Sequence, residues 1–141
     1  MPYRYLEHVG DAAIESTGDT LEQAFAEAGR AMIALMVKTR DLTPDADVEF
    51  EVSAATLEEL LVEFLNELLS LQGLNDLIFT DCWVREIISM GIDYTISGKA
   101  VGVKPEKLHD KLGHEVKAAS YLGLKVEEKH GRFRVQCVLD M

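Results

Sequence analysis

The side chains that could do chemistry in this sequence are polar groups scattered near the expected ends of its helices and strands. They are His8, Asp11, Glu67, His114, Glu115, Lys117, Ser120 and Asp140. Polar residues in loops and at edges are where binding and catalysis are usually found. The motifs Gly-x-x-x-x-Gly-Lys, Gly-x-Ser-x-Gly, His-Glu-x-x-His and Gly-x-Gly-x-x-Gly are all absent from the sequence. We therefore do not expect the protein to be an enzyme in its own right.

Taken singly, each of these residues has a simpler structural interpretation. Asp11 can bond its own backbone in a turn, and Asp140 can be a solvated residue next to the last one. His8 can end a strand, and Lys117 can face solvent from one. The glutamates of the second expected helix form its exposed face, among which only Glu67 is kept as a candidate. No one of these residues establishes a site by itself.

The charge of the chain is strongly asymmetric. Its 25 Asp and Glu against 14 Lys and Arg give a net charge of −11. Residues 1–73 contain 15 acidic and 4 basic residues, whereas residues 74–141 contain 10 of each. An acidic half repels nucleic acid, so we expect no direct nucleic-acid binding. A basic partner protein or a cation is the favoured ligand.

Size and hydrophobicity predict one soluble domain over residues 1–141. A chain of 141 residues buries roughly 68–70% of its unfolded surface, which is enough to fold without a disulfide or structural metal. The longest apolar run, 31–37, is far short of the roughly 20 residues that a membrane span needs, and no signal peptide is expected. We therefore expect a cytoplasmic protein. Cys82 and Cys137 lack zinc or redox spacing and are interpreted as reduced strand residues.

Two amphipathic helices are expected, and each begins with a capping box, a Thr followed three residues later by Gln or Glu. The first should run from Thr20 to about Val37, and the second from Thr56 to near Gly73. Both place apolar residues on one face at helical spacing. The second helix is the most apolar segment of the chain, so it is expected to form the centre of the core.

The rest of the chain is expected to form strands. The expected strand segments are two within 2–15, then 48–52, 77–80, 83–89, 94–103, 115–120, 124–128 and 133–139. In the last segment the alternation directs Asp140 away from the core face. Strands and helices do not alternate strictly, so we predict an α+β fold, with two amphipathic helices packed on a largely antiparallel β-sheet. The Thr-Leu-Glu openings at 20–22 and 56–58 hint at a duplicated strand-helix unit.

Four stretches together resemble the archease family. Its N-terminal signature is similar to Tyr5-Leu6-Glu7-His8-x-x-Asp11-x-x-Ile14, and its second helix is similar to Leu57-Glu58-x-Leu60-Leu61-x-x-Phe64-Leu65-x-Glu67-Leu68-Leu69. Its late strand motif is similar to Glu115-Val116-Lys117-Ala118-x-Ser120-Tyr121, and its ending to Leu139-Asp140-Met141. Their order and spacing cover nearly the whole chain.

The resemblance implies an accessory protein. Archeases assist the RtcB-type tRNA-splicing ligase, which joins RNA ends using GTP and a divalent metal. This chain would then promote guanylylation of that ligase and its repeated turnover. The resemblance also implies a divalent cation, typically calcium, bound by Asp11, Asp140 and the terminal carboxylate of Met141. His8, Glu67, Lys117 and Ser120 are candidates for contacting the partner or supporting the ligands.

The chemistry of these donors fits such a site. Carboxylate oxygens are hard donors suited to Ca²⁺, Mg²⁺ or Mn²⁺. Two carboxylates close together repel each other, and a bound dication relieves that repulsion. Three protein groups cannot supply the 6–8 oxygens that Ca²⁺ prefers, so water or a partner must complete the shell. We therefore expect weak, exchangeable binding.

Two other functions stay open at this level. One is a general acidic protein-binding or chaperone-like module, which would bind many basic proteins in a salt-sensitive way and would need neither metal nor ligase. The other is a metal-dependent hydrolase, which is disfavoured because no general base with a positioned partner is visible. Replacing Asp11 or Asp140 with Asn distinguishes the protein-binding module from the metal-dependent activator. The module should be almost unaffected, whereas the activator should lose its function and keep its fold.

Overall fold

The computed structural model describes residues 2–6, 11–38, 41–89 and 91–141, which form two helices and two antiparallel sheets. The first sheet has the order β1-β2-β7-β6, with β1 Tyr3–Leu6, β2 Ala12–Gly18, β7 Arg132–Asp140 and β6 Ala118–Lys129. The second has the order β3-β5-β4, with β3 Ala46–Ala54, β5 Tyr94–Val103 and β4 Ile78–Ser89. The predicted α+β class is confirmed, with two sheets rather than one.

Both helices begin where the capping boxes predict. Helix α1 spans Leu21–Met36 and helix α2 spans Leu57–Asn75. The Thr20 hydroxyl accepts from the Gln23 N–H, and the Thr56 hydroxyl accepts from the Glu59 N–H, both at 3.1 Å. In the first box the Gln23 side chain accepts from the N–H of Asp19, one residue before the expected donor. The hydroxyl half of both boxes is confirmed.

The Thr56 cap yields a prediction for stability. Thr56→Ala leaves a helix N–H without its protein acceptor, so we expect the free energy of unfolding to fall by about 1 kcal/mol. Urea denaturation followed by circular dichroism measures the change. Thr56→Ser, which keeps the hydroxyl, is the matched control and should stay close to the wild type. An equal loss in both variants would show that the hydroxyl is not the stabilising group.

Three expected boundaries were wrong, one at a helix end and two within strands whose pairing is irregular. Helix α2 continues past Gly73, and a left-handed Asp76 (φ 51°) follows its last residue. The segments expected at 77–80 and 83–89 are one strand, β4, with register shifts along its pairing with β5. The segments expected at 115–120 and 124–128 overlap one strand, β6, which is also irregular. Alternation breaks at such bulges, so the pattern suggested strand ends there.

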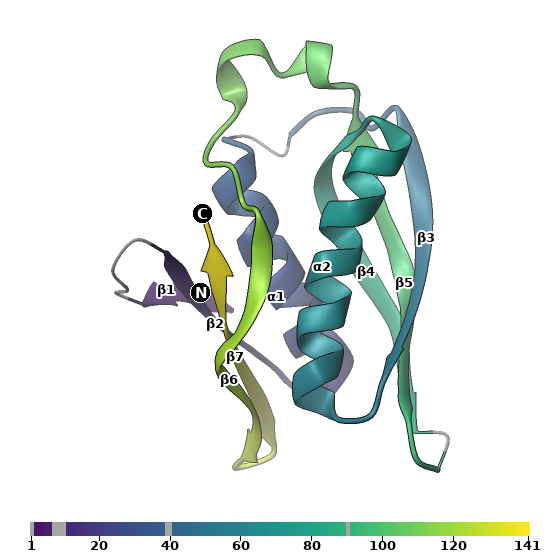
Figure 1. Cartoon of the computed structure of the whole chain (residues 1–141), viewed down its shortest axis with the longest axis vertical. Helices are drawn as coiled ribbons and strands as arrows, with labels where there is room; N and C mark the ends of the chain where they lie inside the picture. Colours follow the sequence, from purple (N-terminus) through teal and green to yellow (C-terminus); the bar gives the residue numbers. More distant parts are fainter. Residues whose placement is uncertain (1, 7–10, 39–40, 90) are drawn as a thin grey trace.

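The two halves of the architecture are built alike. In each sheet, the strand that precedes a helix lies beside the second strand of a hairpin. In the first sheet β2 lies beside β7 of the β6-β7 hairpin, and in the second β3 lies beside β5 of the β4-β5 hairpin. Helix α1 packs against β2 and β4, whereas α2 packs against β3 and β6, so each helix contacts both sheets. Figure 1 shows α2 lying between β6 and β3. This arrangement agrees with the duplicated strand-helix unit suggested by the sequence.

One hydrophobic core joins both sheets and both helices. Phe64 of α2 is fully buried, and its ring centroid lies 6.4 Å from that of Phe25 on α1 and 5.2 Å from that of Phe50 on β3. Ile14 and Val135 of the first sheet belong to the same cluster. No helix in the described ranges is long and apolar enough to span a membrane.

Candidate functional site at the edge of the first sheet

The pairing of β2 with β7 brings positions 11 and 140 to the same end of the first sheet. The ladder runs from Gly18 opposite Phe133 to Ala12 opposite Leu139. The next positions along it are Asp11 and Asp140, so two residues 129 positions apart in the sequence leave the ladder side by side. Strands β2 and β7 are the inner strands of this sheet, and we use "edge" for the side of the sheet that is formed here by the ends of its strands. Asp11 is half-buried and Asp140 is exposed. Figure 1 shows the C-terminal end of the chain beside β1 and β2.

The neighbouring strand β6 supports Asp140 from its other side. Ala118 pairs with Asp140, and the Lys117 N–H donates to the Asp140 carbonyl at 2.8 Å. Ser120 pairs with Val138, and directly paired residues share a face, so Ser120 and Asp140 lie on the same face of the sheet. The Ser120 hydroxyl accepts from the Leu122 N–H at 3.1 Å. The main chain of β6 thus fixes the position of Asp140.

Met141 extends this edge by one residue. Its side chain is half-buried and packs against the hydrophobic core. This contact holds the residue after Asp140 against the body of the protein. Met141 is the third donor in the cation site that the archease resemblance implies.

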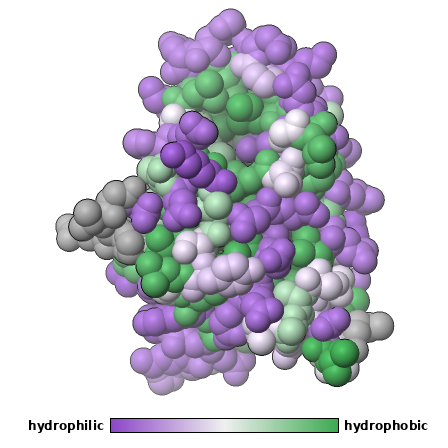
Figure 2. Space-filling view, viewed as in Figure 1, coloured by the Kyte–Doolittle hydropathy of each residue, from purple (hydrophilic) through white to green (hydrophobic). Residues whose placement is uncertain are grey.

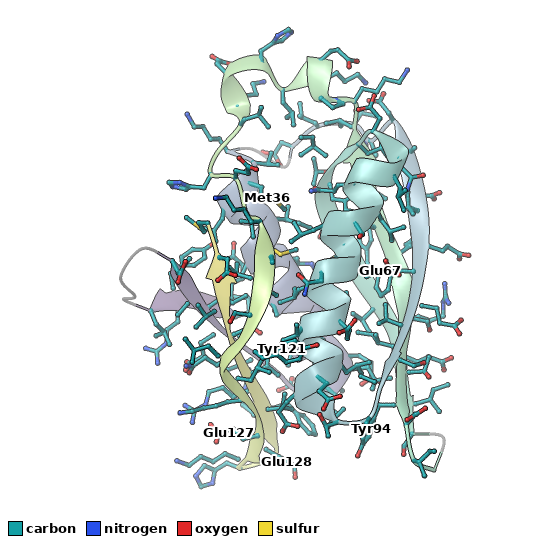
Figure 3. The ribbon with its side chains drawn as sticks, viewed as in Figure 1. Met36, Glu67, Tyr94, Tyr121, Glu127 and Glu128 are labelled. Atoms are coloured by element: carbon teal, nitrogen blue, oxygen red, sulfur yellow. The ribbon has the colours of Figure 1, made fainter. Side chains whose placement is uncertain are left out.

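Of the two remaining candidates, the structure describes only Glu67, which stands apart from this edge. Glu67 is half-buried on α2, which packs on β6 and β3, and Figure 3 shows it on the helix and away from the end of β7. His8 lies outside the described residues. The structure therefore places Asp11, Lys117, Ser120, Asp140 and Met141 near one sheet edge, and it places Glu67 elsewhere.

The donor chemistry at this edge fits a hard cation only with help from the main chain or a partner. Within the described ranges, no three His, Cys, Asp or Glu side chains gather closely enough to hold a metal ion. Asp11 and Asp140 supply two carboxylates, and Met141 would add a main-chain carboxylate. Because Ca²⁺ takes six to eight oxygen ligands, this set is compatible with weak, shared coordination and not with a closed structural centre.

A buried thiol, Cys137, lies three residues before Asp140 and pairs with Ile14 in the β2-β7 ladder. Burial raises the pKa of Cys137 to about 12, although its hydrogen bonds to the Ser120 and Val138 carbonyls act in the opposite direction. A raised thiol pKa keeps the sulfur protonated at neutral pH, and a protonated thiol is a poor nucleophile. Cys137 therefore packs in the sheet and is not suited to nucleophilic catalysis.

Cysteine alkylation tests this interpretation. Cys82 and Cys137 are both free and buried, so native protein treated with iodoacetamide at pH 8 should remain unmodified at both positions. Denatured protein should gain two adducts by mass spectrometry. Rapid modification of native Cys137 at pH 8 would contradict the burial and the raised pKa.

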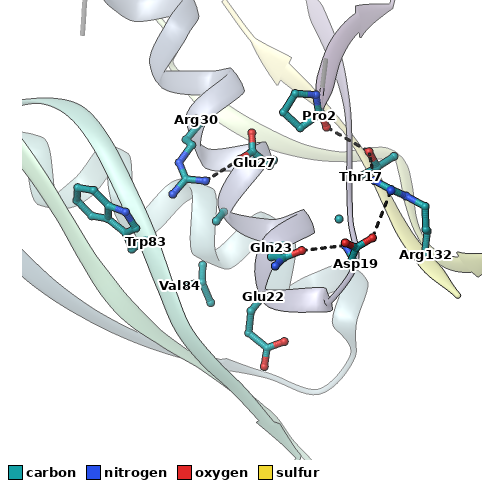
Figure 4. Close-up of a pocket in the computed structure, with 12 residues that line it drawn as sticks. Pro2, Thr17, Asp19, Glu22, Gln23, Glu27, Arg30, Trp83, Val84 and Arg132 are labelled. Carbon is teal, nitrogen blue, oxygen red and sulfur yellow. Dashed lines mark hydrogen bonds and ion pairs between the residues drawn. The ribbon is translucent and has the colours of Figure 1, made fainter. Parts of the chain in front are cut away.

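Sequence analysis did not predict a groove between α1, β4 and the ends of β2 and β7. It has a volume of about 450 Å³ and is lined in part by Arg30, Trp83 and Arg132 (Figure 4). The guanidinium of Arg30 donates to Glu27, Asp81 and the Cys82 carbonyl, while Arg132 pairs with Asp19. These cations already have partners, and the groove presents no nucleophile with a positioned base. We assign it no catalytic role.

These features define a small α+β protein with two strand-helix-hairpin units, in which strands β2 and β7 pair and carry two carboxylates to one edge. The model of the "Archease protein family (MTH1598/TM1083)" matches residues 3–141. The chain belongs to the archease family.

Relatives agree with this assignment, and two solved structures share the fold. "Protein archease" of Pyrococcus furiosus is 37% identical over 142 residues, covering 99% of this chain and 98% of that protein. The same-named protein of Thermococcus kodakarensis is 36% identical, with the same coverage. The solution structure of Methanobacterium thermoautotrophicum protein 1598 matches with a TM-score of 0.85 at 21% identity over 99% of both chains. A Thermotoga maritima structure described as "an archease, possible chaperone" matches at 0.59 and 20% identity, covering 96% of this chain and 94% of that one.

Proposed function

We propose that this chain is an accessory protein of an RtcB-type tRNA-splicing ligase in the cytoplasm, and that it promotes guanylylation of the ligase and repeated rounds of RNA ligation. Membership of the archease family supports the proposal. The observation that carries it is the β2-β7 register, which leads Asp11 and Asp140 to one sheet edge. The chemistry of ligation belongs to the ligase in this proposal, and this chain contributes protein contacts.

The carboxylates at this edge would hold a divalent cation. Asp11, Asp140 and the α-carboxylate of Met141 are the donors, with Ca²⁺ the preferred ion and Mg²⁺ or Mn²⁺ the alternatives. When bound, such an ion supplies positive charge and vacant coordination positions for oxygen ligands. The Lys117 N–H holds the Asp140 backbone in place. Ser120 supports the edge through its bond to the Leu122 N–H.

A ligase assay tests the proposal. Purified ligase is incubated with GTP and Mn²⁺, with or without this chain, and the covalent guanylylated ligase is followed over time. We expect the intermediate to form faster and each ligase molecule to join more than one RNA when this chain is present. Identical rates with and without it would contradict the proposal.

A second candidate is a general acidic module that binds basic proteins, as the words "possible chaperone" for the Thermotoga maritima relative suggest. The acidic half of the sequence, with 15 Asp and Glu against 4 Lys and Arg, favours it. Such a module would bind many basic proteins, and 0.5 M salt would weaken every complex. Its binding would not depend on Asp11 or Asp140, whereas ligase activation would.

A further inference from the structure

Strand β6, at one side of the first sheet, has an irregular pairing with β7 midway along its length. Ser120 pairs with Val138 and Lys125 pairs with Gln136, so residues 121–124 stand opposite Cys137 alone. Gly123 adopts a positive φ of 69° within this bulge. A bulge of this kind leaves the extra residues without ladder partners and changes the direction of their side chains.

Two large side chains of the bulge are exposed to solvent. Tyr121 is 57% exposed and Leu122 is 65% exposed. Tyr121 lies between β6 and α2 (Figure 3), where its hydroxyl donates to the Glu63 carboxylate at 2.7 Å. On the face shown in Figure 2, hydrophobic patches reach the surface between hydrophilic side chains. We call Tyr121, Leu122 and the nearby Glu59 and Glu63 the bulge surface.

The bulge surface has an acidic rim. The hydrogen bond to Glu63, partial desolvation and the charges of Glu63 and Glu59 raise the pKa of Tyr121. In the described ranges, no Lys, Arg or His nitrogen lies within 4.0 Å of either glutamate as an ion pair. An apolar centre beside carboxylates that have no cationic partner in the described ranges is complementary to an apolar side chain flanked by Arg or Lys.

We propose that the bulge surface docks the RNA ligase through an apolar side chain on the ligase that is flanked by basic residues. The identity of the partner rests on the proposed function. A second copy of this chain is a poor occupant because it carries the same net charge of −11 and would bring acidic rim against acidic rim. A basic surface is a general property of proteins that handle RNA.

The position of the bulge surface suits this role. Along β6, Tyr121 is three residues from Ala118, which pairs with Asp140. At about 3.3 Å per residue, that distance is roughly 10 Å. Tyr121 contacts α2, whereas Asp140 lies on the face of the sheet that it shares with Ser120. A protein docked on the bulge surface would therefore lie beside the edge that carries Asp140, close to the proposed cation site but not directly over it.

Matched pairs of variants test the proposal by measuring the affinity of the full chain for the purified ligase. Leu122→Ser removes the exposed apolar centre, and Ile92→Ser, at a position 88% exposed in the β4-β5 turn, is its control. Glu63→Gln removes a charge but keeps an acceptor for Tyr121, and Glu51→Gln on β3 is its control.

We expect Leu122→Ser to weaken binding about tenfold or more, since buried apolar anchors dominate interfaces. Glu63→Gln should weaken it about threefold and reduce its salt dependence.

The outcomes separate this inference from the proposed function. Both controls should bind within about twofold of the wild type, as expected for positions outside an interface. If the wild type stimulates the ligase but Leu122→Ser binds as tightly as Ile92→Ser, the docking inference is wrong and the proposed function stands. If the wild type neither binds nor stimulates the ligase, both fail. Self-association of the wild type that Leu122→Ser abolishes would also overturn the inference, because the occupant would then be a second copy.

Discussion

Replacing Asp140 with asparagine is expected to remove stimulation of the RNA ligase while leaving this chain folded. Asparagine keeps the shape and one oxygen of the side chain but loses the negative charge that a hard cation requires. Loss of an outer partner of a metal ligand typically costs 10–100-fold in affinity or activity, so loss of a direct ligand should reduce stimulation by about 100-fold. The rate of ligase guanylylation at a fixed concentration of this chain measures the effect.

The fold of the Asp140→Asn variant should persist because the strand is held there by its backbone. Ala118 pairs with residue 140, and the Lys117 N–H donates to its carbonyl. Asp93→Asn, which removes the same charge from an exposed turn, is the control and should stimulate like the wild type. If Asp140→Asn and Asp93→Asn stimulate equally, the carboxylate at position 140 plays no part in activation.

Replacing Phe64 with alanine should produce the largest loss of stability. Phe64 is fully buried, and its ring contacts rings from α1 and β3, so its removal leaves a cavity where both helices and the second sheet meet. Truncation of a buried phenylalanine costs about 3–5 kcal/mol. Because small domains are stable by only about 5–15 kcal/mol, a substantial fraction of the variant could unfold near physiological temperature.

Urea denaturation measures the change in unfolding free energy. Leu74→Ala on the same helix is the matched control, because Leu74 is 80% exposed. We expect that variant to stay within about 0.5 kcal/mol of the wild type. If Phe64→Ala lowers the free energy of unfolding by less than about 1 kcal/mol, either the core closes around the missing ring or α2 is not the centre of the core.

The helices could be predicted from the sequence because their signals are local. Thr20 and Thr56 cap their helices through side chains three residues away, and the apolar faces repeat every turn. Strand 94–103 was also predicted with its observed bounds. The end of α2 was missed because Asp76 adopts a left-handed conformation that its residue type does not require. Strands β4 and β6 were divided in the prediction because their bulges depend on pairing with β5 and β7.

The candidate site could not be predicted from local sequence, because it depends on the pairing of β2 with β7. Nothing in the composition or periodicity around Asp11 indicates that β2 pairs with β7, and the resemblance to archeases supplied that expectation. The register now provides a physical basis for the proximity of Asp11 and Asp140. The bulge surface was missed because Tyr121 and Leu122 were expected to lie between two strands rather than within one irregular strand.

Calcium titration by calorimetry tests most directly whether Asp11 and Asp140 share one cation. The account predicts saturable binding of one Ca²⁺ per wild-type chain, and loss of that binding in both Asp11→Asn and Asp140→Asn, with circular dichroism spectra unchanged. Wild-type protein that binds no Ca²⁺, Mg²⁺ or Mn²⁺, or binding that survives unaltered in both variants, would contradict it.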